Sequence, residues 1–142
     1  MRTAEERPTG TADPASGAGG PAAADPAMAE IEAAAFRRLL AHLRLREDAS
    51  NIALMGLAGF CRNCLADWLV EASVAAGRPI DRETARTYVY GEPYAAWKAR
   101  QPEATPDEVA RMEASIAETA RRRAKAAALL PNPEQPAGAG GG

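Results

Sequence analysis

The stretch NIALMGLAGFCRNCL at residues 51–65 carries the strongest information about the fold. It is apolar nearly all round as far as Phe60, and it lacks the period-two alternation of a half-buried strand. We therefore predict a helix here, and we expect it to be the central and most buried element of the domain. Gly56 and Gly59 permit either the close approach of a neighbouring helix or a break that starts a new helix near Phe60.

Helix signals continue on both sides of this stretch. Residues 29–46 place apolar side chains three and four positions apart, which predicts a first amphipathic helix. Ser50 can cap a second helix, and Gly77 can end it near residue 76. The later signals are an N-cap at Asp81 and a stop at Gly91 for a helix over 82–90, a turn or short helix with Trp97, and a capping box of Thr105 and Glu108. We predict an all-α fold, a compact array of four to five helices.

The last predicted helix follows the capping box. Val109, Met112, Ile116 and Ala120 recur at helical spacing and form the stripe that we expect to be buried. Beyond this stripe the apolar pattern thins, so we expect the basic run over residues 121–125 to project into solvent.

The two ends of the 142-residue chain are poor in large apolar side chains. Residues 1–27 and 131–142 combine proline, glycine and alanine, and neither segment can bury enough surface to offset the entropy of ordering it. We therefore predict a disordered low-complexity N-terminal tail, a disordered C-terminal tail and a single helical domain over residues 28–130, a common domain size.

The charge balance gives no reason to expect a nucleic-acid partner. The chain carries 17 basic and 19 acidic residues, for a net charge of −2. No apolar run approaches the roughly eighteen residues of a membrane span, and the amino terminus lacks the hydrophobic segment of a secretory signal. We expect no membrane partner and a cytoplasmic location, where thiols stay reduced unless they are catalytic, metal-bound or redox-sensing.

Cys61 and Cys64 form a Cys-x-x-Cys pair and are the only cysteines of the chain. Their spacing is compatible with packing in a helix interface, with metal binding and with thiol redox chemistry. If they only pack, we expect no cofactor. If they bind zinc or iron, we expect the remaining ligands to be His42, the single histidine, and either Asp67, one helical turn beyond Cys64, or a water.

The aromatic residues cluster in two segments near the cysteines and near the predicted short helix. We interpret most of them as core residues with polar tips that reach the surface. Exposed together beside an arginine, they would instead form a partner-binding patch. The candidate interaction surface consists of Arg62, Asn63, Trp68, Tyr88, Tyr90, Tyr94 and Trp97.

Residues 51–65 and the segment YVYGEPYAAW at 88–97 resemble a known family. With Phe36 and His42 upstream, they closely resemble the short bacterial proteins grouped as "domain of unknown function 1244", whose hallmark is Asn-Ile…Leu-Met…Leu-Ala-Gly-Phe-Cys-Arg-Asn-Cys. The resemblance covers about residues 30–115 and implies a small helical domain. It supplies no mechanism.

Two classes of function follow from these observations. The first is a small interaction or adaptor module that binds another protein and in which Cys61 and Cys64 are structural. The second is a metal-binding or thiol-redox protein in which these two cysteines carry the chemistry. A chain with one histidine and no recognisable catalytic constellation offers little for an enzyme, so we favour the first class and leave enzymatic activity open.

Overall fold

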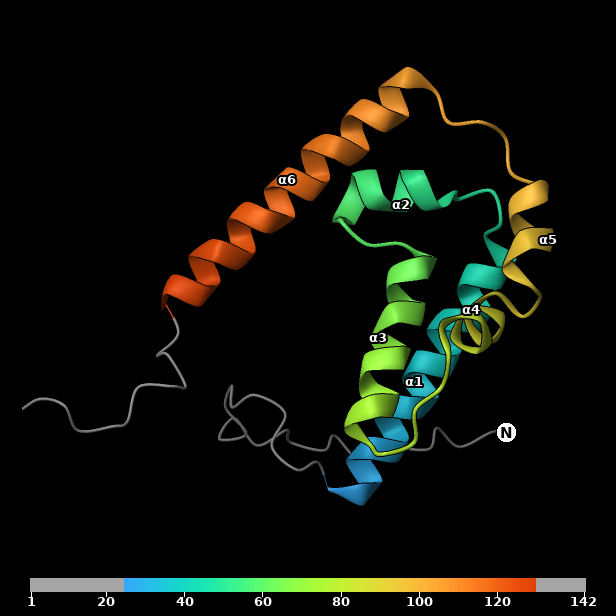
Figure 1. The fold of residues 1–142 in the computed structure, drawn as a ribbon, viewed down its shortest axis with the longest axis vertical. Coiled ribbons are helices and arrows are strands. Elements are labelled where there is room, and N and C mark those ends of the chain that lie inside the picture. Colours follow the sequence, from blue (N-terminus) through green and yellow to red (C-terminus); the bar gives the residue numbers. More distant parts are fainter. Residues whose placement is uncertain (1–24, 130–142) are drawn as a thin grey trace, which may run out of the picture. The chain divides into compact units, whose positions relative to one another are not determined.

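The computed structural model describes residues 25–129, and these residues form helices joined by short connections, with no strand among them. The helices are α1 (Pro26–Leu45), α2 (Asn51–Ala58), α3 (Arg62–Ala75), α4 (Arg82–Tyr90), α5 (Tyr94–Ala99) and α6 (Pro106–Leu129) (Figure 1). The predicted all-α class is confirmed. The described residues hold six helices rather than four to five, because the stretch over 51–76 forms two helices.

The predicted tails lie outside the described residues, except for residues 25–27. Helix α1 begins at Pro26, earlier than the predicted start at Ala29. Proline suits the first helical position because its φ is already fixed and the missing N–H has no helical partner there. Asp25 Oδ1 accepts a hydrogen bond of 3.2 Å from the Ala27 N–H, which supports the start of the helix.

The chain divides into two units, residues 1–37 and residues 38–142. The described part of the first unit is the first half of α1, where Arg37 donates a hydrogen bond of 3.1 Å to Glu30. The second unit contains the end of α1 and all of helices α2 to α6.

The core of the second unit is built by the end of α1 together with α3, α4 and α5. Helix α3 packs against α4, and α4 packs against α5. The buried apolar side chains are Leu40, Leu43, Cys61, Leu65, Ala66, Ala85, Val89, Tyr90 and Trp97. Removing such side chains from water is the main favourable contribution to folding of the unit.

Helix α2 is not the most buried element, so that prediction is wrong. None of its residues is buried, and Leu57 is 84% exposed. A short helix that is apolar all round needs neighbours on every side, whereas α2 packs mainly against α6. The prediction that α2 is apolar on all sides is correct. The other helices of the same chain, however, bury only part of its surface.

Helix α6 also departs from prediction because none of its residues is buried. Val109 and Met112 are half-buried against the rest of the unit, while Ile116 and Ala120 are exposed. At 1.5 Å per residue, α6 is roughly 36 Å long and α2 is roughly 12 Å long. Helix α2 is therefore too short to cover the stripe, and residues 121–129 are exposed throughout.

The predicted helix caps are confirmed by their hydrogen bonds. Ser50 and Asp81 each accept a bond from the backbone N–H three residues later, at 3.1 and 2.7 Å. Glu108 N–H donates to Thr105 Oγ1 at 3.2 Å, and Thr105 N–H donates to Glu108 Oε2 at 3.0 Å, which is a capping box. Gly91, in the left-handed conformation, ends α4 as predicted.

Across residues 25–129, no single helix is long and apolar enough to cross a membrane. Helices α2 and α3 reach that length and composition only when taken together, and they are bent by 79° at the break between them. The bend occupies residues 59–61, where the chain turns sharply (Figure 1).

Candidate functional site

The break between α2 and α3 positions the two cysteines. Gly59 adopts a left-handed conformation with φ of 73°, and its N–H donates to the Met55 carbonyl at 2.9 Å, which ends α2. Cys61 has extended backbone angles and is the N-cap residue of α3. Cys61 therefore precedes the first turn of a new helix and Cys64 lies within it, so the break near Phe60, one of the two alternatives that the glycines left open, is observed.

Three sulfur atoms gather at this turn. The Sγ atoms of Cys61 and Cys64 are 3.9 Å apart, too far for a disulfide bond, and Cys64 Sγ is also 3.9 Å from Met55 Sδ. Cys61 is buried and Cys64 is half-buried. Burial raises the pKa of the Cys61 thiol above its ordinary value, so Cys61 is a weak nucleophile at neutral pH.

Arg62, between the two cysteines, is the most buried charged side chain described, with 2% of its surface exposed. Its guanidinium donates to the carbonyls of Leu43, Arg46 and Ala49 at 3.1, 2.8 and 2.6 Å. These carbonyls lie at and just beyond the end of α1, where the negative end of the helix dipole favours a cation. The guanidinium also lies 5.1 Å from the Trp97 ring centroid. Arg62 thus ties α1, α3 and α5 together.

Asn63 belongs to a second buried network, centred on Tyr90. The Tyr90 hydroxyl accepts a hydrogen bond from Asn51 Nδ2 at 2.7 Å and donates one to Asn63 Oδ1 at 2.9 Å. Burial raises the pKa of Tyr90 to about 12. Asn51 also accepts a bond of 3.3 Å from Arg62, so the two networks join and link the starts of α2 and α3 to the end of α4.

The predicted interaction residues do not share one exposed surface. Arg62, Tyr90 and Trp97 are buried, Asn63 and Tyr94 are half-buried, and Trp68 and Tyr88 are 45% and 46% exposed. The Tyr90 ring packs 4.8 Å from the Trp97 ring between centroids. Arg62, Tyr90 and Trp97 therefore belong to the interior, whereas Trp68 and Tyr88 stay open to solvent.

The four predicted metal ligands are not assembled in one place. His42 is exposed on α1, and Asp67 forms an ion pair of 3.0 Å with Arg82. Over residues 25–129, no three or more His, Cys, Asp and Glu side chains lie close enough together to hold a metal ion. Cys61 and Cys64 remain a pair, with Met55 as their nearest additional sulfur donor.

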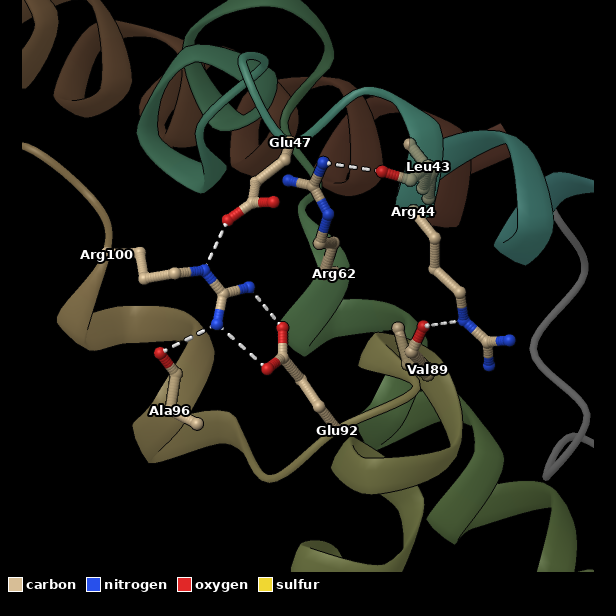
Figure 2. Close-up of polar contacts among 8 residues, drawn as sticks. All are labelled: Leu43, Arg44, Glu47, Arg62, Val89, Glu92, Ala96 and Arg100. Atoms are coloured by element: carbon tan, nitrogen blue, oxygen red, sulfur yellow. Dashed lines mark hydrogen bonds and ion pairs between the residues drawn. The ribbon is translucent and has the colours of Figure 1, made fainter.

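Two further arginines, Arg44 and Arg100, link the segments around Arg62 (Figure 2). Neither was predicted from the sequence. Arg44 on α1 donates to the Val89 carbonyl at the end of α4, at 3.3 Å. Arg100 bridges Glu47 and Glu92, each at 2.9 Å, and it lowers the pKa of the Glu92 carboxyl. The acceptor of Arg44 is a main-chain carbonyl, and a sequence does not show which carbonyl a side chain contacts. No local pattern in the sequence pairs Arg100 with Glu47 or Glu92.

A groove of about 390 Å³ lies between α3 and α6. The side chains that bear on its chemistry are Met55, Cys64, Trp68 and Glu71 on one wall and Ile116 and Arg123 on the other. Its walls are largely apolar and its edges carry charge. Neither Glu71 nor Arg123 forms an ion pair within the described part of the chain.

Over residues 25–129, the fold and these contacts define a small helical domain whose Cys-Arg-Asn-Cys segment is buried at Cys61 and Arg62 and half-buried at Asn63 and Cys64. Residues 49–114 match the family model described as "Protein of unknown function (DUF1244)". The match contains both segments, 51–65 and 88–97, that carry the resemblance seen in the sequence, and it confirms that resemblance. No curated protein matches the chain.

Proposed function

We propose that this domain is a protein-interaction module and that the groove between α3 and α6 binds helix α6 of a second copy. The observation that carries the proposal is the exposure of α6, a helix of 24 residues of which none is buried. Helices in proteins gain most of their stability from the packing of an apolar face against other elements. A second copy would supply the packing that α2 is too short to provide.

Large apolar side chains around the groove support the proposal. Trp68 and Ile116 line the groove and are 45% and 46% exposed. Single exposed apolar residues are ordinary, but a group of them at one groove is typical of an interaction site. Burying them against another helix would be favourable by roughly 25 cal/mol for each Å² removed from water.

The charges at the edges of the groove favour a second copy over an unrelated helix. Glu71 lies on the α3 wall and Arg123 on the α6 wall, and both lack an ion-pair partner within the described residues. In a two-fold dimer each contact occurs twice, with the roles of the two copies exchanged. Glu71 of each copy can then meet Arg123 of the other.

The buried Arg62 and the half-buried Asn63 have a supporting role in this proposal. Their hydrogen bonds hold the start of α3 against α1 and α4, and α3 forms one wall of the groove. A rigid wall lowers the entropy lost on binding. Arg62 and Asn63 would thus support the groove, whereas Cys64 of the same segment lines it.

Sedimentation equilibrium of the full chain tests the proposal. We expect the mass to exceed 14.9 kDa and to approach twice that value as concentration rises. Ile116→Asp places a charge at the centre of the interface and should raise the dimer dissociation constant at least about tenfold. Tyr88→Asp is the matched control, because Tyr88 is also 46% exposed but lies on α4, away from the groove.

Two results would overturn the proposal. One is a wild-type chain that remains at 14.9 kDa at all accessible concentrations. The other is equal dissociation of Ile116→Asp and Tyr88→Asp, which would place the interface elsewhere. Far-ultraviolet circular dichroism of both variants shows whether each retains its helices, so that misfolding is separated from dissociation.

A further inference from the structure

Three sulfur atoms lie close together at the turn between α2 and α3. Two are cysteine thiols and one is the thioether of Met55, and they lie in a chain of 3.9 Å separations centred on Cys64. Thiolate and thioether are soft ligands, the kind that selects monovalent copper. We propose that Met55, Cys61 and Cys64 bind one Cu(I) ion.

The observed distances suit a metal bound by sulfur. With metal–sulfur bonds of about 2.3 Å, two ligating sulfurs are about 4.0 Å apart in a trigonal arrangement. The separations of 3.9 Å from Cys64 Sγ to Cys61 Sγ and to Met55 Sδ are already close to this value. The left-handed Gly59 and the extended Cys61 shape the turn between the helices that carry these donors, and two of the three sulfur pairs already have the separation that a trigonal ion requires.

The donor set favours copper over the zinc or iron expected from the sequence. Zinc in structural sites takes four ligands, usually cysteine and histidine, and no group of three His, Cys, Asp and Glu side chains occurs over residues 25–129. His42 is exposed, and Asp67 is engaged by Arg82. A site of two thiolates and one thioether matches the preference of Cu(I).

The site has an entry path. Met55 and Cys64 both line the groove between α3 and α6, whereas Cys61 behind them is 7% exposed. An ion can therefore enter from the groove and end partly shielded from water. A shielded, largely apolar surrounding controls solvent access to a bound metal.

The charge of the bound site also fits its position. Each cysteine thiol loses one proton as it forms a bond to the ion, and no electron is transferred. Two thiolates and one Cu(I) leave a net charge of −1 at the first turn of α3, of which Cys61 is the N-cap. Helix N-termini stabilise negative charge.

A competition titration tests this site. The reduced full chain is mixed anaerobically with Cu(I) and bicinchoninate, a coloured Cu(I) chelator, and the colour reports the copper taken by the protein. We expect one Cu(I) per chain for the wild type. Met55→Leu, which keeps volume and apolarity, should weaken binding by roughly ten- to a hundredfold, and Cys64→Ser should abolish it.

Met112→Leu is the matched control, because Met112 is also half-buried but lies on α6 and should leave copper binding unchanged. Thermal unfolding of the metal-free variants checks that each remains folded. Copper binding by Met55→Leu as tight as that of the wild type would overturn the three-sulfur site. So would a stoichiometry well below one Cu(I) per chain in the folded, fully reduced wild type.

Discussion

Arg62 shows how a single buried cation can be stable without a carboxylate. Its guanidinium is matched by main-chain carbonyls at the end of α1 and by the amide oxygen of Asn51. A buried charge is costly unless it is fully hydrogen-bonded, and here main-chain carbonyls and one side-chain amide supply the acceptors. Burial lowers the pKa of Arg62, but arginine stays protonated throughout the working range. The residue thus stabilises α1 and α3 at once.

Arg62→Lys should therefore destabilise the domain although it keeps the charge. Lysine offers fewer donors without the planar fork, so several carbonyls lose their hydrogen bonds, and we expect the free energy of unfolding to fall by about 3 kcal/mol. Urea denaturation measures the change. Arg82→Lys is the control, because Arg82 makes an exposed ion pair with Asp67 and should change stability by less than about 0.5 kcal/mol. Equal effects of the two substitutions would contradict the role of Arg62.

Tyr90 gives the domain a stability that depends on pH. Its pKa in the folded state is about 12, against 10.0 for an ordinary tyrosine, so the folded state holds the proton more tightly than the unfolded chain. This contribution is present below pH 10.0 and is lost as the pH rises toward about 12. We expect the wild type to lose about 1–2 kcal/mol more than Tyr90→Phe between these limits.

Denaturant unfolding across this pH range measures the difference. Tyr90→Phe should already be less stable at about pH 9, because Asn51 and Asn63 lose their shared partner. Parallel loss of stability in the two proteins would show that Tyr90 does not titrate as the structure indicates.

At the residue scale, sequence reasoning succeeded where the cause is local. Ser50, Asp81 and Thr105 were predicted as caps because an N-cap acts on N–H groups two or three residues away. The role of Arg62 could not be predicted in the same way. Its acceptors are main-chain carbonyls 13 to 19 residues away, and main-chain groups are the same whatever the sequence.

At the scale of elements, the contact between α2 and α6 depends on two glycines. A Cβ at Gly56 would lie 3.3 Å from the Arg111 Cβ, and a Cβ at Gly59 would overlap the Thr119 hydroxyl. Both glycines thus allow α6 to approach α2 closely, and Gly59 also supplies the left-handed turn. Close approach and a break were alternatives in the sequence, and the structure uses both.

Gly59→Ala should therefore destabilise the domain more than Gly77→Ala. Both glycines have a positive φ, 73° and 71°, but a Cβ at Gly77 would meet nothing within 4 Å. The backbone cost is about 1–2 kcal/mol at either position, and displacement of α6 adds to it only at Gly59. Urea denaturation of the two variants gives the comparison. A smaller loss for Gly59→Ala would mean that α6 does not rest on this turn.

The burial of α2 and α6 could not be predicted from their sequences. Ile52 through Phe60 are apolar on all sides, a pattern typical of a core helix, but the pattern does not say which chain provides the cover. Leu57 and Ile116 were expected inside and are exposed in the single chain. If a second copy packs against α2 and α6, their apolar pattern reflects burial in the dimer and not in the single chain.

At the scale of the whole molecule, two parts of the second unit have different roles. The end of α1 with α3, α4 and α5 encloses the core, and buried polar networks around Arg62 and Tyr90 fix it. Helices α2 and α6 leave apolar surface open beside the groove. We expect the first part to account for most of the stability and the second to provide the apolar surface for a second copy, while the Cu(I) ligands lie where the two parts meet, with Met55 on α2 and the two cysteines at the start of α3.

The most direct test of the interaction proposal mixes two charge-reversal variants, Glu71→Arg and Arg123→Glu. Each variant alone places like charges at both symmetry-related contacts of a dimer, so each should sediment near 14.9 kDa. The Glu71→Arg copy is positive at both positions, and the Arg123→Glu copy is negative at both. In an equimolar mixture, a dimer of one copy of each therefore has opposite charges at both contacts. We predict that the mixture sediments near twice the chain mass. A mixture that stays monomeric would contradict pairing of the groove with a second α6.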